Sequence, residues 1–248
     1  MIVGSQGKVN LGLENRAAVM QPYLFPYIGY FQLIACSDSF VLFDNVNFIK
    51  KGWINRNRII VDQQEKLFTI PLGKISQNKL ISEFHIHDWE ESRKSFLHLI
   101  EQGYRKAPFF EETWPVLTES LNISDDQLVA VIKNTLRVFC EYLNITTPIF
   151  VASEIQGISE LKGEDKIIDI LSHFEVKTYV NPPGGRELYS QEKFKENNLN
   201  LKFLKLPLAK EYSQLSNKFI PYLSIIDLVM NVDRNLLINM VRSYELED

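Results

Sequence analysis

The sequence predicts an α/β fold built on a mostly parallel sheet. Short apolar runs at residues 17–20 and 39–44 lack polar alternation, which is typical of strands buried on both faces. A segment with helical spacing, residues 29–35, lies between them, and strand, helix, strand is the signature of a parallel crossover unit. No linker rich in glycine, serine or proline divides the rest of the chain, so we expect a single α/β unit.

The later elements follow from the same patterns. Residues 58–61 and 67–70 predict two strands around a polar turn, and the alternation at 82–87 predicts a strand with one wetter face. Helical periods dominate from residue 89 to about 143, which predicts a helical insertion over about 89–145. The remaining expected elements are strands at 149–151, 178–180 and 201–206, and helices at 162–172 and 223–230.

The chain is expected to begin with an extension. Residues 1–16 are polar, contain three glycines and show no sustained period, which predicts a flexible N-terminal segment. Residues 17–248 are then expected to form the single domain.

Composition excludes several classes of protein. Apolar residues at 45% and charged residues at 23% are ordinary for a globular domain, which excludes a wholly disordered or fibrous chain. A net charge of -4 with well-mixed signs predicts no partner of duplex nucleic acid. Two cysteines cannot form a disulfide framework, and no apolar run approaches the ~20 residues of a membrane span. We therefore expect a cytoplasmic protein, with a homo-oligomer left open.

The stretch from Met20 to Tyr30 is the strongest candidate for a functional loop. Two prolines, a glycine and three tyrosines lie between a buried strand and a helix. Ligands of open parallel sheets bind at this carboxyl end of the strands, where the next helix offers N–H groups to an anion. Gly29 would let a ligand approach the backbone closely. A purely structural aromatic turn is the alternative, and we favour the functional loop.

A second cluster lies at residues 50–58 and combines four cations, two amides and an indole. The planar guanidinium groups of Arg56 and Arg58 suit bidentate phosphate contacts, and Trp53 could stack on a base or sugar. Asn55 could read hydroxyl or amide groups. A solvated basic surface is the alternative. The interleaved indole and amides favour a phosphate-bearing ligand.

Two further features follow predicted strands. Asp44 ends the second strand, where its carboxylate could orient an amine, bind Mg²⁺ or simply cap a turn. Residues 181–189 hold the chain's one Gly-Gly pair, which allows close ligand approach, and Arg186 would face a carboxylate or phosphate. A tight strand-to-helix turn is the alternative for this loop. His85 and His87 share a predicted strand face without a third ligand at a standard spacing, so no metal site is expected.

These same residues carry a resemblance to a known family. Residues 20–34 read Met-Gln-Pro-Tyr-Leu-Phe-Pro-Tyr-Ile-Gly-Tyr-Phe-Gln-Leu-Ile. This run resembles the opening motif of the WbqC-like family almost unchanged, and the likeness continues at residues 43–48, 51–58, 181–189 and 223–227. Members are associated with O-antigen and other surface-glycan gene clusters. The resemblance implies a transferase that adds an aminoacyl group, such as glycine, to the amine of a nucleotide-linked amino sugar.

A weaker resemblance is to the nucleotidylyltransferase-like superfamily, which includes pantothenate synthetases. Those enzymes carry a His-x-Gly-His motif after the first strand, and residues 27–30 of this chain, Tyr-Ile-Gly-Tyr, occupy the corresponding place. The resemblance implies a Rossmann-like fold of nucleotidylyltransferase type, with ATP and Mg²⁺ as cofactors and an acyl-adenylate as the activated donor. Both histidines are tyrosines here, so either the catalysis is altered or only the fold is shared.

The two resemblances together imply roles for single residues. Tyr30, Asp44 and Arg56 would be catalytic, with Asp44 orienting or deprotonating the amine. The nucleotide would be held by Gln21, Tyr23, Tyr27, Gly29, Lys51 and Arg58. The acceptor and other substrate groups would contact Trp53, Asn55, Asn181, Gly184, Gly185 and Arg186.

Two alternatives from other classes remain open at this point. In one, the donor is already charged, as an aminoacyl-tRNA or an acyl carrier, and no ATP is needed. In the other, the protein binds a nucleotide-linked sugar without catalysis.

Overall fold

The computed structural model describes residues 15–74, 78–158, 160–205 and 211–248. Its central sheet has six strands in the order β5-β2-β1-β6-β7-β8, and every neighbouring pair is parallel except β7 and β8. The predicted α/β fold with a mostly parallel sheet is confirmed. The strands are β1 (Arg16–Met20), β2 (Ser39–Leu42), β5 (Ile149–Val151), β6 (Thr178–Asn181), β7 (Asn200–Lys205) and β8 (Glu245–Glu247).

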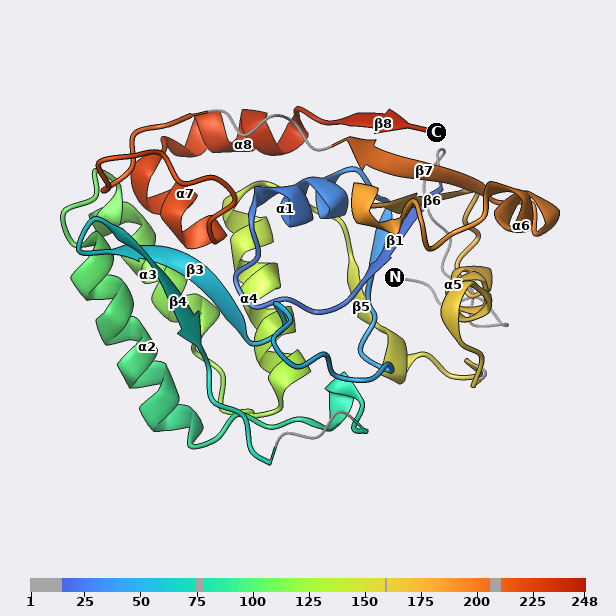
Figure 1. The fold of residues 1–248 in the computed structure, drawn as a ribbon, viewed down its shortest axis with the longest axis horizontal. Helices are drawn as coiled ribbons and strands as arrows, with labels where there is room; N and C mark the ends of the chain where they lie inside the picture. The colour runs from blue at the N-terminus through green and yellow to red at the C-terminus, as the bar shows by residue number, and fades with distance from the viewer. Residues whose placement is uncertain (1–14, 75–77, 159, 206–210) are drawn as a thin grey trace.

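Both faces of the sheet are covered, which explains the unbroken apolar runs in the sequence. Side chains alternate across a strand, so Phe40 and Leu42 of β2 join one apolar cluster and Val41 joins the other. Helices α1 (Ile28–Ala35) and α8 (Arg234–Arg242) cover the first face (Figure 1). Helices α5 (Gly163–Ser172) and α6 (Gln191–Glu196) cover the second.

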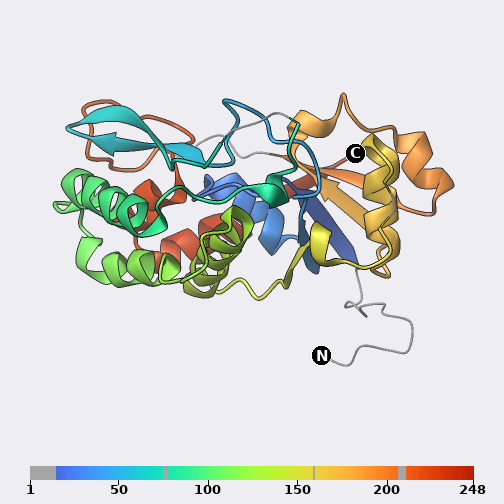
Figure 2. The same cartoon turned by 90° about the horizontal axis from the view of Figure 1, so that it is seen from below.

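A second group of elements lies beside the sheet. The antiparallel hairpin of β3 (Arg56–Val61) and β4 (Gln64–Thr69) packs against α2 (Trp89–Tyr104) (Figure 2). The chain then forms α3 (Phe110–Ser120) and α4 (Leu128–Tyr142), and α7 (Ile225–Asn231) returns to pack against α3 and β3. These elements share the larger of the two apolar clusters with the first face of the sheet.

The structure corrects one predicted strand. Residues 82–87 do not form a ladder: Ile81–Glu83 is a turn of 3₁₀ helix, and two isolated bridges follow, between Ile86 and Leu72 and between His85 and Gln127. The alternation of buried and exposed side chains is real, since Phe84 and Ile86 are buried and His85 is exposed. Among the residues that the structure describes, no continuous partner strand lies alongside this segment, so alternation alone did not produce a strand.

Other differences lie at the ends of the chain. Helices α6 and α8 and strand β8 were not predicted. Residues 1–14 of the predicted extension lie outside the described residues, and Arg16, placed in that extension, already begins β1. Among the described residues, no helix is both long and apolar enough to cross a membrane.

The strand order fixes where a ligand could approach the sheet. From β1 the chain moves outward through β2 to β5, and it then crosses back to β6 on the other side of β1. This reversal is the topological switch point of a Rossmann arrangement, and ligands bind there outside the carboxyl ends of the strands. The loops that follow β1, β2, β5 and β6 therefore all leave the same edge of the sheet.

One buried carboxylate joins the hairpin, α2 and the C-terminal helices. Asp227 of α7 is fully buried and accepts hydrogen bonds from the hydroxyl groups of Tyr104 (2.9 Å) and Tyr212 (2.5 Å). The side-chain amide of Gln214 donates a third bond at 2.9 Å. The Tyr104 hydroxyl in turn accepts the N–H of Ile60 in β3. Burial raises the pKa of Asp227, and the three hydrogen bonds oppose that rise.

Removing this carboxylate should destabilise the fold. Asp227→Ala leaves the hydroxyl groups of Tyr104 and Tyr212 without their acceptor, and each unsatisfied buried donor costs about 1–3 kcal/mol, so we expect a loss of about 3 kcal/mol. Urea unfolding at neutral pH measures it. The control is Glu175→Ala at an exposed site, expected to change stability by less than about 0.5 kcal/mol. A loss as small as the control's would show that the network contributes little.

Candidate functional site

A buried carboxylate supports an exposed hydroxyl at the carboxyl edge of the sheet. Asp44, just beyond β2, is 1% exposed. One of its oxygens accepts the backbone N–H of Ser153 (2.9 Å) and the other accepts the Ser153 hydroxyl (2.6 Å). Ser153 lies in the short 3₁₀ helix after β5, and its side chain is exposed. Burial raises the pKa of Asp44, and the Ser153 hydrogen bonds oppose that rise.

A lysine approaches the same edge from α5. The Nζ atom of Lys166 donates to the backbone carbonyl of Asn45 (2.6 Å) and lies 5.9 Å from the centre of the Phe43 ring. Partial burial lowers the pKa of Lys166, and the carboxylate of Asp44 opposes that shift. Lys166, Asn45 and Ser153 all line one pocket of about 690 Å³.

The stretch from Met20 to Tyr30, the first motif loop, is more buried than its sequence indicates. Tyr30 is buried, its hydroxyl donates to the backbone carbonyl of Gln21 (2.8 Å), and burial raises its pKa well above the ordinary value. Tyr23 packs on Tyr30 with ring centres 5.7 Å apart. Gly29 is buried at the start of α1. In this arrangement the Tyr30 hydroxyl is engaged inside the protein, so the Tyr-Ile-Gly-Tyr segment does not fit a phosphate site of the His-x-Gly-His kind.

Tyr27, in contrast, lies at a partly exposed position beside a distant part of the chain. Its ring meets that of Tyr222 edge to face, with centres 6.2 Å apart. Burial, with Tyr23 and Tyr222 nearby, raises the pKa of Tyr27 to about 12. Tyr222 itself is 49% exposed and has a φ of +57°, a conformation that is uncommon for a bulky residue.

The basic cluster forms a surface of one indole and two guanidinium groups. Trp53 is exposed, and the Arg56 and Arg58 guanidinium carbons lie 5.7 and 5.8 Å from the centre of its ring. Arg56 also donates to the backbone carbonyls of Gly52 and Lys51. Lys51 is exposed at a φ of +62°. Both arginines therefore lie beside the Trp53 ring, and Arg56 also holds the loop at residues 51–52 through its backbone carbonyls.

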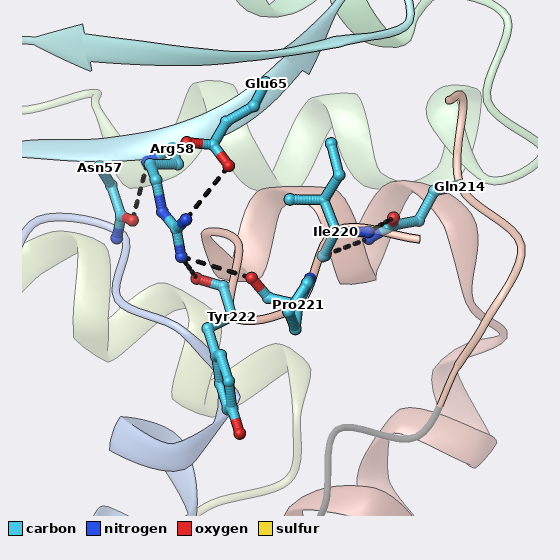
Figure 3. A network of polar contacts seen from close by, with 7 residues as sticks. All are labelled: Asn57, Arg58, Glu65, Gln214, Ile220, Pro221 and Tyr222. Carbon is cyan, nitrogen blue, oxygen red and sulfur yellow. Dashed lines mark hydrogen bonds and ion pairs between the residues drawn. The ribbon is translucent and has the colours of Figure 1, made fainter. Parts of the chain in front are cut away.

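Arg58 joins this surface to the segment that ends in Tyr222. Its guanidinium group pairs with Glu65 of β4 (3.1 Å) and donates to the backbone carbonyls of Pro221 (3.3 Å) and Tyr222 (3.2 Å) (Figure 3). Gln214 holds the neighbouring Ile220 through the backbone. Tyr27, Trp53 and Tyr222, which are remote in sequence, are thus brought into one region.

The two asparagines of the basic cluster hold the backbone. The Asn55 amide donates to the carbonyl of Ile70 and the Asn57 amide to the carbonyl of Phe25, both at 2.8 Å. Asn55 and Asn57 are buried. The Asn57 bond fixes the start of the hairpin against the loop at residues 20–30, and the Asn55 bond joins the two ends of the hairpin.

The loop at residues 181–189, the third motif loop, turns tightly beyond β6. Asn181 is buried, and Gly185 packs so closely on it that an added Cβ would overlap the Asn181 amide. Gly184 is exposed with free space around it. Arg186 pairs with Glu247 of β8 (2.5 Å), donates to the backbone carbonyl of Asp248 and stacks on Phe203 (4.5 Å). The arginine therefore ties the loop to the edge of the sheet.

The arrangement at the sheet edge includes residues that the sequence analysis did not single out. Asp44 was predicted, but its partner Ser153 and the neighbouring Lys166 were not. A serine directly after a predicted strand was the available signal for Ser153. Lys166 lies within a predicted helix, where a lysine is usually solvated, and Tyr222 follows a segment without any clear period.

The pH dependence of stability tests the environment of Asp44. The folded pKa lies above the ordinary 3.8, so the folded protein retains a proton at pH values where the unfolded chain has lost it. The stabilisation is complete below the unfolded pKa and declines as pH rises through the folded pKa. Between about pH 4 and 7, the free energy of unfolding of the wild type minus that of Asp44→Asn should therefore fall. A rising difference would contradict a raised pKa.

Adjacent glycines provide a matched test of the third loop. Gly185→Ala forces the new Cβ against Asn181 and Tyr189, and we expect a loss of stability of about 1–3 kcal/mol. Gly184→Ala meets no atom within 4 Å and should change stability by less than about 0.5 kcal/mol. Thermal and urea unfolding of the two variants measure the difference. Equal stabilities would mean that the loop relaxes around the added methyl group.

Comparisons with known proteins can now be set beside this geometry. A protein of Mycobacterium tuberculosis (strain ATCC 25618 / H37Rv), named "Uncharacterized protein Rv1507c", is 27% identical over 225 residues, which cover 88% of this chain and 94% of that protein. No solved structure matches the chain. The model of the WbqC-like protein family matches residues 21–237, a range that includes residues 21–30, 50–58 and 181–189. The chain therefore belongs to the WbqC-like protein family, which is associated with glycan biosynthesis.

Proposed function

We propose that this protein transfers an aminoacyl group, such as glycine, to the amine of a nucleotide-linked amino sugar in glycan biosynthesis. The observation that carries the proposal is Ser153, an exposed residue whose hydroxyl is hydrogen-bonded to the buried Asp44 carboxylate at the carboxyl edge of the sheet. An amine that attacks a carbonyl carbon must lose a proton, and a carboxylate with a raised pKa accepts one more readily than an ordinary aspartate does.

The transfer step can be written with these groups. The sugar nitrogen attacks the carbonyl carbon of an activated acyl donor, which is an acyl phosphate ester, an oxygen ester or a thioester. A carbon–nitrogen bond forms, and the bond between the carbonyl carbon and the leaving oxygen or sulfur breaks. The amine proton passes to the Ser153 oxygen while the Ser153 hydroxyl proton passes to Asp44. From Asp44 the proton returns to the leaving group or to water.

How the donor is activated is a separate matter. Two residues for which the resemblances imply catalytic roles are engaged within the protein: the Tyr30 hydroxyl donates to the Gln21 carbonyl, and Arg56 donates to carbonyls of its own loop. We therefore assign no step to ATP. An adenylated donor and a pre-charged donor such as aminoacyl-tRNA both deliver the same acyl group to the amine.

The test is product formation by the purified protein. UDP-glucosamine is incubated with glycine, ATP and Mg²⁺ in one mixture and with glycyl-tRNA in another, and mass spectrometry follows the gain of one glycyl unit. Positioned proton transfer contributes about 10²- to 10⁴-fold, so Asp44→Asn should lower the rate at least about 100-fold, and Ser153→Ala should also reduce it. Ser172→Ala, an exposed serine at the far end of α5, is the matched control.

The results of the two mixtures distinguish an ATP-derived donor, a pre-charged donor and a non-catalytic binder. Product in the first mixture supports an ATP-derived donor, and product in the second alone supports a pre-charged donor. Binding of UDP-glucosamine without product in either mixture would replace the transferase with a non-catalytic binder. Wild-type rates in both Asp44→Asn and Ser153→Ala, with the protein folded, would remove the proton relay.

A further inference from the structure

We propose that the pocket between β2, β5 and α5 binds the phosphorylated amino-sugar part of the acceptor, with Lys166 and Lys162 on the phosphate and Asn45 with the Asp44–Ser153 pair on the amine. This rests on the proposed function and adds Asn45, Ser153 and Lys166, to which the sequence analysis assigned no role. We call this cavity the Lys166 pocket.

The Lys166 pocket has the size and walls that such a ligand requires. Its volume of about 690 Å³ falls within the ~300–1,000 Å³ usual for small-molecule sites. Apolar side chains form part of the wall, among them Leu80, Ile155 and Leu161, and they suit the C–H faces of a sugar ring. Polar groups converge from the ends of β2 and β5, where ligands of parallel sheets bind.

Two cations lie on the α5 side of the pocket. Lys162 is the extended residue that directly precedes α5, Lys166 lies near the start of the helix, and both line the cavity. The acids of the first turn are engaged elsewhere: Glu164 accepts the backbone N–H of Ser190, and Asp165 pairs with Lys193. Glu160, at an exposed position, also lines the pocket.

The donor capacity of Lys166 is only partly used. An ammonium group has three donors, and the bond to the Asn45 carbonyl accounts for one of them. Partial burial disfavours its charge and lowers its pKa, which a phosphate in the pocket would counter because it supplies an opposite charge. Lysine commonly binds phosphate as a point charge, and this geometry leaves hydrogens available for that contact.

Acceptors for an amine lie beside Lys166, at the ends of β2 and β5. Asn45 lines the pocket, and its side-chain oxygen is buried without a hydrogen-bond partner among the described residues. A buried acceptor without a partner is costly, and an ammonium group in the pocket would satisfy it once the Asn45 side chain turns its oxygen toward the cavity. Ser153 lines the same pocket and stands in front of Asp44, which places the amine beside the proton relay of the proposed function.

Binding measurements test this assignment. Glucosamine 1-phosphate, glucose 1-phosphate and inorganic phosphate are titrated into the full-length protein by calorimetry. Glucosamine 1-phosphate should bind at least tenfold more tightly than glucose 1-phosphate, and Asn45→Ala should reduce that preference. Lys166→Met should weaken binding of both sugar phosphates at least tenfold, and Lys166→Arg less. Lys94→Met, at an exposed position on α2, is the matched control and should bind as the wild type does.

A second measurement needs no variant. Competitive acetylation of the wild-type protein, read by mass spectrometry, should show Lys166 protected by saturating glucose 1-phosphate, which has no amine that reacts with the reagent, while Lys94 is not protected. Wild-type affinity in Lys166→Met, binding no tighter than that of inorganic phosphate, or unprotected Lys166 would each overturn the assignment.

The two proposals fail separately. If the wild type forms product and Lys166→Met has an unchanged KM for UDP-glucosamine, the pocket assignment is wrong and the transferase stands. If glucosamine 1-phosphate binds through Lys166 and no product forms in any mixture, the pocket stands and the transferase is wrong.

Discussion

The buried carboxylate of Asp227 is the contact on which the arrangement beside the sheet depends. It accepts bonds from α2 and from the segment before α7, and through the Tyr104 hydroxyl it also reaches β3. Charge burial is costly unless hydrogen bonds replace water, and here both carboxylate oxygens have partners. The same network holds Gln214. Its side chain positions Ile220 next to the backbone carbonyls that accept hydrogen bonds from Arg58. The exposed Tyr222 and the Trp53 surface therefore depend on a group that a ligand would never touch.

The sheet contributes a different constraint. Parallel strands buried on both faces leave polar groups only at their ends, so chemistry collects at the carboxyl edge. Asp44 lies just beyond β2 and Ser153 follows β5, and these strands are neighbours in the sheet although more than a hundred positions separate the two residues in sequence. The hairpin and three helices inserted between β2 and β5 add a second layer beside the sheet without disturbing that pairing.

The sequence predicted the fold well because its signals were local. The unbroken apolar runs at residues 17–20 and 39–44 report burial on both faces, and the motif loops fall at strand ends as expected. Residues 82–87 were predicted as a strand and form only isolated bridges. Alternation shows which side chains are buried but not whether a partner strand exists. The pairing of Asp44 with Ser153 and the approach of Lys166 depend on strand order and on how α5 is placed. No spacing within a single segment contains that information.

A sequence shows which side chains are charged but not whether they are already hydrogen-bonded within the protein. Arg56, Arg58 and Arg186 stand in the motifs, and each donates to backbone carbonyls within its own loop or a neighbouring segment. Such bonds shape the loops, because a guanidinium group has five donors in a rigid fork and can hold several carbonyls at once. Lys166 carries no motif, yet it lines a pocket beside a buried carboxylate with most of its donors unused. In this protein the arginines of the motifs hold loops together, and Lys166 lines the pocket proposed above for the ligand.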